Sequence, residues 1–337
     1  MWHGGIDLRR FPLGVHRTTT TLTWRDRWVH VLARLGWRRT HHRVCPGLYA
    51  VGNPTPDAPV FVTANYALSF DALRSALGGI DGYILVLDTE GINVWCAAGK
   101  GTFGTEELLR RIEATRLREV VRHRTLILPQ LGAAGVCAHE VQRRSGFRVE
   151  YAPVRAKDLP AYLRMGRATP EMRRVRFGLA DRLVLIPVEV VHVLWPTAVV
   201  GLVLWFLAGR LAAFGALAAV LAGVVAFPIL LPWIPTRDFS SKGFLLGGLV
   251  ALPFALKSWL GNPDGTLVSR LLGSGTFLLG LPPVTAFLAL NFTGSTPFTS
   301  RSGVRREILR YVRSMAGLFA AGLVLLLISI GLRLAGG

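Results

Sequence analysis

Long uncharged runs in the second half of this 337-residue chain restrict its fold more than any other feature. Residues 183–337 contain 11 Lys or Arg and only 4 Asp or Glu. One helix needs about 20 predominantly apolar residues to cross a bilayer, and several runs reach that length. The sequence therefore predicts a polar N-terminal domain followed by an all-α transmembrane domain of five helices. The expected spans are 183–209, 211–236, 243–261, 271–291 and 314–332.

The basic residues between the spans predict their orientation, because cytoplasmic loops carry more Lys and Arg than the opposite side. With the N-terminal domain in the cytoplasm, the cytoplasmic loops hold Arg237, Lys242, Arg301, Arg305, Arg306, Arg310 and Arg313. The opposite side holds Arg210, Arg270 and Arg333, and Lys257 reaches toward it. We expect a multi-pass protein of the cytoplasmic (inner) membrane, with the C-terminus outside and the lipid bilayer as a partner.

The formal net charge of +19 has two explanations, a membrane surface and a nucleic acid. The linker expected at 166–182 contributes a basic collar of Arg173, Arg174, Arg176 and Arg182 beside the first span, where anionic lipid attracts each cation. No RNP, helix-turn-helix or zinc-finger pattern accompanies the charge, so no nucleic-acid partner is expected. The first thirty residues have no apolar run typical of a secretory signal, and three cysteines cannot form a disulfide framework.

The polar half alternates short apolar runs with helical patterns, which is typical of an α/β sheet with helices on its faces. A basic N-terminal arm is expected at 1–44, loosely ordered apart from a short helix near 28–35, and a Rossmann-like α/β domain at 45–165. The expected strands are 47–51, 59–65, 82–88, 93–97, 125–129 and 148–153. The expected helices are 69–77, 105–121, 135–145 and 156–164. Ligands of such sheets bind beyond the carboxyl ends of the strands, here 63–66, 88–91, 130–132 and 152–154.

The segment 91–107 is the most unusual part of the polar half. Its Gly-Lys-Gly-Thr string does not match the Walker phosphate-loop pattern, because Val94 and Gly101 stand where that pattern needs Gly and Ser or Thr. Thr105 is placed to cap the next helix. Cys96 alone is more typical of a small buried residue, and one thiolate cannot make a zinc site. The functional alternative is an axial ligand to a metal held by a macrocycle, either a corrin or a haem.

The string Asn-Val-Trp-Cys-Ala-Ala-Gly-Lys at 93–100 closely resembles the cap-helix signature of the membrane corrinoid proteins of bacterial mercury methylation. The sequence from 46–53 through 62–66 is also similar to the corrinoid domain of the corrinoid iron–sulfur protein of acetyl-CoA synthesis. That relative lacks the cysteine and carries an iron–sulfur cysteine set that is absent here. The resemblance covers about residues 45–165, and the five spans with the segment 291–298 also fit the mercury family.

The resemblance implies a corrinoid (cobalamin, base-off) with Cys96 as the catalytic residue and the lower axial ligand of cobalt. The helix presenting Cys96 would consist of Asn93, Val94, Trp95, Ala97, Ala98, Gly99 and Lys100. Strand-end geometry adds the corrin-rim candidates Thr63, Asn65, Gln130, Gly132 and Val154. Cys45 and Cys137 could relay Hg(II), although structural burial is the expected role for both.

The implied activity is that of a corrinoid-dependent methyltransferase that methylates Hg(II). Hg(II) is an electrophile, so it must receive the methyl group as a carbanion or radical equivalent, and a thiolate ligand stabilises the cobalt left behind. Regenerating Co(I) then needs low-potential electrons. A ferredoxin-like [4Fe–4S] protein is the implied donor, because the chain has no cluster motif. The methyl group would come from a methyl-folate or its protein carrier.

Three other functions remain open at this stage. The first is a membrane-anchored corrinoid methyl carrier of one-carbon metabolism with a non-mercury acceptor. The second is a transporter with a regulatory domain, for which the sequence offers only Glu189 and His192 in the first span and the pair Pro282 and Pro283 in the fourth. The third is a haem–thiolate protein. Glu189 and His192 could hold a metal or a proton, but their place near the end of the span favours interfacial hydrogen bonds.

Overall fold

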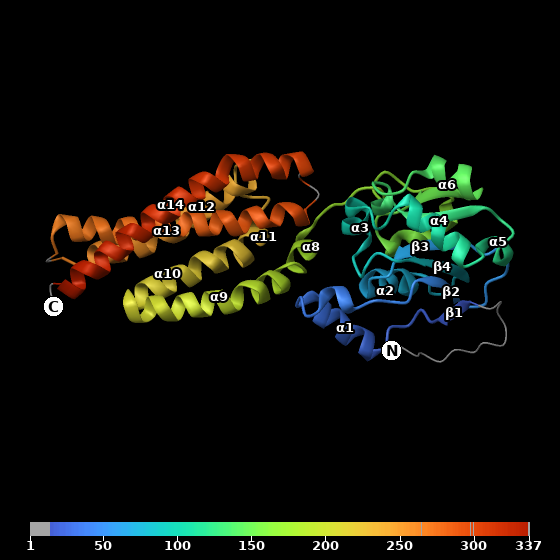
Figure 1. The fold of residues 1–337 in the computed structure, drawn as a ribbon, viewed down its shortest axis with the longest axis horizontal. Coiled ribbons are helices and arrows are strands. Elements are labelled where there is room, and N and C mark those ends of the chain that lie inside the picture. The colour runs from blue at the N-terminus through green and yellow to red at the C-terminus, as the bar shows by residue number, and fades with distance from the viewer. Residues whose placement is uncertain (1–13, 264, 297, 299, 336–337) are drawn as a thin grey trace. The chain divides into compact units, whose positions relative to one another are not determined.

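The computed structural model describes residues 14–263, 265–296, 298 and 300–335, which form two compact units, 1–175 and 176–337. The boundary lies inside the segment 166–182 that the sequence sets apart as a linker. The first unit is an α/β domain and the second is helical (Figure 1). This confirms the predicted succession of an α/β part and an all-α part.

A six-stranded mixed sheet with the order β1-β2-β4-β3-β5-β6 organises the first unit. Its strands are β1 (Val15–Thr18), β2 (Gly47–Val51), β3 (Val60–Ala64), β4 (Gly82–Leu87), β5 (Thr125–Pro129) and β6 (Arg148–Ala152). All neighbours are parallel except β2 and β4, which are antiparallel. β2, β3 and β4 are buried along their whole length, because helices cover both faces of the sheet.

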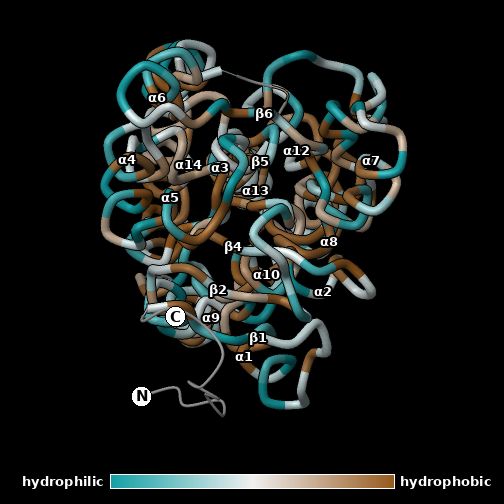
Figure 2. The backbone as a smooth tube through the Cα atoms, turned by 90° about the vertical axis from the view of Figure 1, so that its right-hand side faces the viewer, coloured by the Kyte–Doolittle hydropathy of each residue, from teal (hydrophilic) through white to brown (hydrophobic). Residues whose placement is uncertain are grey.

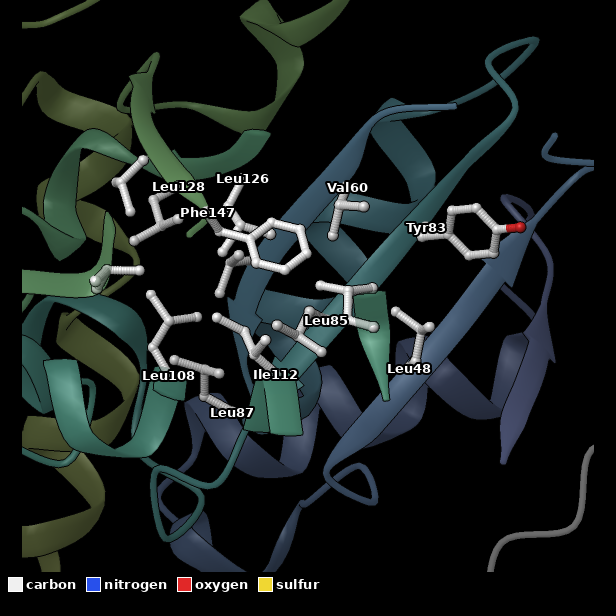
Figure 3. Close-up of a cluster of buried hydrophobic side chains, with 14 of the residues drawn as sticks. Leu48, Val60, Tyr83, Leu85, Leu87, Leu108, Ile112, Leu126, Leu128 and Phe147 are labelled. Carbon is white, nitrogen blue, oxygen red and sulfur yellow. The ribbon is translucent and has the colours of Figure 1, made fainter. Parts of the chain in front are cut away.

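The helices of the first unit divide between the two faces of the sheet. One face packs against α3 (Val94–Lys100), α4 (Thr105–Ala114), α5 (Leu117–Val120) and α6 (Ala138–Ser145). Figure 3 shows this core, in which Leu85 and Leu87 of β4 lie near Leu108 and Ile112 of α4. The other face packs against α2 (Ala67–Ala76) and α7 (Leu159–Met165). Figure 2 shows hydrophilic residues along α4 and α6 and hydrophobic ones along β4.

Five of the six strands predicted at 45–165 occur within a residue or two of their expected bounds. The sixth prediction is wrong, because 93–97 belongs to helix α3 and not to a strand. Asn93 caps the start of that helix, and Gly101 ends it with a φ of 91° in the left-handed region. A short apolar run fits a strand and a buried helix equally well, and these two terminal signals decide between them.

Residues 14–44, which the sequence assigns to a basic arm, contribute two elements to the α/β unit. β1 extends the sheet by pairing with β2, and α1 (Trp24–Arg34) packs against α2. The expected helix near 28–35 therefore exists and begins earlier. Residues 1–13 lie outside the described part of the chain.

The second unit contains, among the described residues, five helical segments long and apolar enough to cross a membrane. They are Leu179–Leu207, Arg210–Leu230, Phe239–Leu260, Leu267–Gly294 and Ser302–Ala335. The elements are α8 (Leu179–Leu183), α9 (Ile186–Leu207), α10 (Arg210–Leu221), a π-helical turn (Ala222–Ala226), α11 (Phe227–Leu230), α12 (Phe239–Leu260), α13 (Leu267–Asn291) and α14 (Arg301–Ala335). Each of the five segments overlaps one of the predicted spans.

Two details of the second unit differ from the sequence-based expectation. α14 begins at residue 301, so the basic stretch assigned to a loop before the fifth span is helical. Pro282 and Pro283 do not break the fourth span, because α13 continues through both. A helix tolerates internal prolines where close packing against neighbouring helices stabilises it. Here Pro282 lies against Gly247 of α12. His192 is exposed, and the described residues contain no group of three or more His, Cys, Asp or Glu able to hold a metal.

Candidate functional site

The sheet opens between β3 and β5. These strands are paired only at Val60 with Leu126 and at Phe61 with Ile127, although each strand continues for several residues. β3 leads into α2 on one face, and β5 leads toward α6 on the other face. Neighbouring parallel strands whose helices leave on opposite faces form a crevice at their carboxyl ends, which is the usual ligand position in such sheets.

A cavity of about 380 Å³ lies at this crevice. Its walls come from the ends of β3, β5 and β6, from α2 and α7, and from the first turn of α3. Most of the walls are apolar, and the polar side chains among them are Thr63, Tyr66, Ser69 and Asn93. Ligand cavities are about 300–1,000 Å³, so this one accepts a group as large as a nucleobase.

Helix α3 presents Cys96 beside this cavity. Asn93 Oδ1 accepts a hydrogen bond from the backbone N–H of Cys96 at 2.9 Å, which caps the helix. Val94 and Trp95 line the cavity, and Cys96 is exposed. The interpretation of Cys96 as a small buried core residue is therefore wrong. Its thiol is therefore accessible at the surface and not part of the core.

Close backbone contacts hold α3 against the loop after β5. A Cβ atom on Gly135 would lie 2.1 Å from the carbonyl oxygen of Phe103 and 3.0 Å from Cα of Ala98. A Cβ atom on Gly132 would lie 2.5 Å from the ring of Phe103, which is fully buried. Both positions therefore need glycine. Ala97 and Ala98 are buried on the same side, so the helix turns Cys96 outward on a fixed base.

Asn65 organises the loop between β4 and α3. Its Oδ1 accepts hydrogen bonds from Thr89 N, Thr89 Oγ1 and Gly91 N, and its Nδ2 donates to Asp88 Oδ1. Gly91 has a φ of 73°, and a Cβ there would lie 2.2 Å from the carbonyl oxygen of Thr40. Asn65 is buried and does not line the cavity. Its contacts are those of a residue that positions the loop.

The predicted site residues fall into two groups in the structure. Those lining the cavity are Thr63, Asn93, Val94, Trp95 and Val154. Those outside its lining are Asn65, Cys96, Ala97, Ala98, Gly99, Lys100, Gln130 and Gly132. Gly99 and Lys100 are exposed on α3, and Gln130 Oε1 accepts a hydrogen bond from Arg173 at 2.7 Å.

Sequence reasoning missed the contribution of α2 to the cavity. Leu68, Ser69 and Ala72 lie along its first two turns and all line the cavity, next to Tyr66 of the strand-end segment 63–66 that the sequence did indicate. The available signal was their position directly after the carboxyl end of β3. Helical spacing at 68, 69 and 72 places one side of α2 against the crevice.

The other two cysteines do not have the expected buried role. Cys45 and Cys137 are both exposed, so the expectation of structural burial is wrong for each.

Thr105 also differs from its expected role, since Gly104 is the N-cap of α4. The Thr105 hydroxyl instead accepts a hydrogen bond from Cys137 N at 2.8 Å. Burial raises the pKa of the nearby Tyr151 hydroxyl, which donates to the carbonyl oxygen of Val136 and stays neutral.

Comparisons with known proteins find relatives of the α/β unit. Residues 27–163 match the family described as the CO dehydrogenase/acetyl-CoA synthase delta subunit. The gamma subunit of the acetyl-CoA decarbonylase/synthase complex from Archaeoglobus fulgidus is 37% identical over 127 residues, which are 37% of this chain and 27% of that protein. The corresponding subunit from Methanopyrus kandleri is 33% identical over the same shares of both chains.

These matches show what the first unit is similar to. They confirm the resemblance to the proteins of acetyl-CoA synthesis, and the match begins inside α1, before the expected boundary at residue 45. This chain spans about a quarter of the length of the curated relatives that it matches. The match ends before the helices of the second unit.

Proposed function

We propose that this chain is a corrinoid-dependent methyltransferase in which Cys96 is the axial thiolate ligand of cobalt. The observation that carries the proposal is the exposure of Cys96 on a capped, rigidly packed helix beside the cavity at the sheet crevice. A thiolate must be accessible to bind a metal. One that acts alone suits a metal whose other positions are filled by a macrocycle.

The residues present fit a corrinoid with its nucleotide base displaced from cobalt. The cavity takes a nucleobase-sized group and not a whole macrocycle, so Thr63, Ser69 and Val154 would hold the tail. Cys96, Trp95 and Lys100 would face the ring from α3. The bound corrinoid would supply a cobalt that carries a methyl group to an acceptor. Asn93 and Gly135 fix the helix, so they would orient the thiolate.

We propose Hg(II) as the acceptor, giving methylmercury. The support is the resemblance of 93–100 to the mercury-methylation signature together with the exposed cysteine. The electron donor would be a ferredoxin-like [4Fe–4S] protein, and the methyl donor a methyl-folate or its protein carrier. The five apolar helices would anchor the chain in the cytoplasmic membrane, with the α/β unit in the cytoplasm and the C-terminus outside.

A second candidate is a membrane-anchored methyl carrier of one-carbon metabolism. The comparisons favour it, since the relatives are subunits of the acetyl-CoA decarbonylase/synthase complex. Both candidates use the same cavity and the same Cys96. They differ only in the acceptor.

An acceptor assay separates the two candidates. The full chain is reconstituted with isotope-labelled methylcobalamin and offered Hg(II) in one arm and a non-mercury acceptor, such as a thiol, in the other. The mercury proposal expects labelled methylmercury from the wild type and a loss of at least about tenfold with Cys96→Ala. Transfer only to the other acceptor supports the carrier. Methylmercury formed equally by Cys96→Ala and by free methylcobalamin contradicts the mercury proposal.

A further inference from the structure

Helix α1 exposes an apolar stripe and buries Asp26 on the opposite side. Trp24, Trp28, Val31 and Leu35 follow the i, i+4, i+7, i+11 spacing of one helix face, and all are exposed. The exposed fractions are 79% for Trp24 and 57% for Trp28. Trp37, just beyond the helix, is 64% exposed. A surface helix of a globular protein normally turns this stripe toward the core.

A buried ionic cluster fixes this orientation. Arg74 of α2 donates from Nη2 to Asp26 at 2.8 Å and from Nε to Asp71 at 2.6 Å. His30 lies 2.7 Å from the other oxygen of Asp71. Arg74, Asp26 and Asp71 are each at most 4% exposed.

Further hydrogen bonds lock the start of the helix. Arg74 Nη1 donates to the carbonyl oxygens of Thr19 and Thr21, and Thr23 forms a capping box with Asp26. The cluster lies on the face of α1 opposite the tryptophans. Rotating the helix to bury its tryptophans would therefore break the cluster and leave buried charges without partners.

Basic side chains surround the exposed stripe. Arg25, Arg27, Arg34, Arg38 and Arg39 are all exposed. Asp26 is the sole acidic residue of α1, and it is buried against Arg74. Trp at the level of the headgroups and Arg beside anionic lipid are the two features of helices that lie in a membrane surface.

We propose that the outer face of α1 lies in the headgroup region of an anionic bilayer. The same chain has five helices long and apolar enough to cross a membrane, and the membrane anchoring proposed for them would give α1 a high local concentration of lipid. A soluble protein partner would bind the exposed aromatic residues equally well. The five exposed arginines, with no exposed acidic residue on α1, favour the phosphates of anionic lipid instead. This inference rests on the proposed membrane anchoring and is independent of the corrinoid and of the methyl acceptor.

Spin labels on the full chain in nanodiscs test the proposal. The background is Cys45→Ser, Cys96→Ser and Cys137→Ser, since all three native cysteines are exposed and would take the label. Labels are placed in turn at Val31→Cys on the stripe, at Leu202→Cys on α9 and at Arg143→Cys on α6. Nanodiscs contain equal parts of phosphatidylcholine and phosphatidylglycerol. Collision rates with oxygen, which enters lipid, are compared with those of a water-soluble nickel chelate.

We expect the oxygen-to-nickel ratio at 31 to lie between the high ratio at 202 and the low ratio at 143. A ratio at 31 equal to that at 143 would overturn the proposal, provided that 202 reports insertion. Shielding of 31 from both reagents would overturn it in favour of protein contact. Trp28→Cys repeats the measurement at a second position if Val31→Cys folds poorly.

Charge gives a second readout on the same label. Replacing Arg25, Arg27 and Arg34 by Gln removes three surface cations and leaves the buried cluster intact. Each basic residue near an anionic surface changes the ratio of bound to free helix roughly fivefold, so the triple variant should move the ratio at 31 toward that at 143. The same shift is expected for the unsubstituted helix in pure phosphatidylcholine. An unchanged ratio in both cases would contradict the proposed role of the arginines.

Discussion

Asn93 Oδ1 accepts a hydrogen bond from the backbone N–H of Cys96 at 2.9 Å, so the residue that caps α3 also holds the backbone of the proposed cobalt ligand. The bond satisfies one of the free N–H groups in the first turn of the helix. It joins a local folding signal to the geometry of the candidate site. The order of α3 and the position of the thiol should therefore change together.

Removing this cap should loosen α3. Asn93→Ala is expected to cost about 1 kcal/mol, since it deletes the side-chain acceptor, whereas Asn93→Asp retains an acceptor. Amide hydrogen exchange followed by mass spectrometry should show roughly fivefold faster exchange in peptides covering 94–100 for Asn93→Ala. Equal exchange in wild type and Asn93→Ala would show that the cap does not stabilise the helix.

The glycine behind α3 should tolerate no side chain. Gly135→Ala places a methyl group against three backbone atoms of Phe103 and Ala98, so we expect a loss of at least about 1–3 kcal/mol and weaker cobalamin retention. Gly78→Ala is the matched control, because nothing lies within 4 Å of its Cβ position. Thermal unfolding of the α/β unit, followed by circular dichroism, measures the difference. A similar melting temperature for the two variants would refute the close approach.

The ionic cluster beneath α1 should be worth far more than a surface pair. Arg74→Met leaves Asp26 and Asp71 buried without their partner, at an expected cost of about 3–5 kcal/mol. Arg122→Met removes an exposed pair with Asp57 and should cost at most about 1 kcal/mol. Chemical denaturation monitors both variants. Equal stability would contradict the assignment of α1 to this cluster.

Protonation of Asp26 in acid should release α1 from the ionic cluster. Burial raises the pKa of this carboxyl, but hydrogen bonds from Thr23 and Arg74 outweigh burial and hold the pKa below its ordinary value of 3.8. Its stabilising contribution is therefore complete above about pH 4 and is lost as the pH falls through the lowered folded-state pKa.

The mobility of a spin label at Val31→Cys follows this release. We expect mobility to rise below about pH 4 in the parent chain and to depend less on pH in Asp26→Asn, which has no carboxyl to protonate. Identical acid profiles for the two chains would assign the transition to another group.

Filling the cavity should exclude the cofactor tail without unfolding the chain. Ser69→Phe projects a ring into the cavity from α2 and should raise the Kd for cobalamin about tenfold or more, through an overpacking cost of 1–3 kcal/mol. Ser75→Phe, on an exposed position of the same helix that does not line the cavity, should leave the Kd unchanged. Equal affinity of the two variants would remove the cavity from the binding site.

The sequence predicts the sheet well because its strands are continuous apolar runs bounded by turn residues, as at 47–51 and 125–129. It fails at 93–97, where the same apolar character lies in a helix and only Asn93 and Gly101 mark the ends. It also places Asn65 at the right edge of the sheet but cannot show that this side chain turns into the loop.

Tertiary contacts explain what the sequence could not provide. The outward stripe of α1 depends on Arg74, which is distant in sequence and lies on another helix. The exposure of Cys96 depends on Gly135 and Phe103, which fix the opposite side of α3. Neither relation leaves a periodic signal, because each joins one residue to a partner far along the chain.

The absorption spectrum of the full chain reconstituted with cobalamin, beside Cys96→Ala and Cys137→Ala, tests the central claim most directly. The proposed ligation expects a base-off spectrum with a thiolate-shifted cobalt band in the wild type and in Cys137→Ala, another exposed cysteine. Cys96→Ala should still bind cobalamin, because the cavity is unchanged, and should lose the shifted band. Identical spectra for Cys96→Ala and the wild type would show that Cys96 does not bind cobalt.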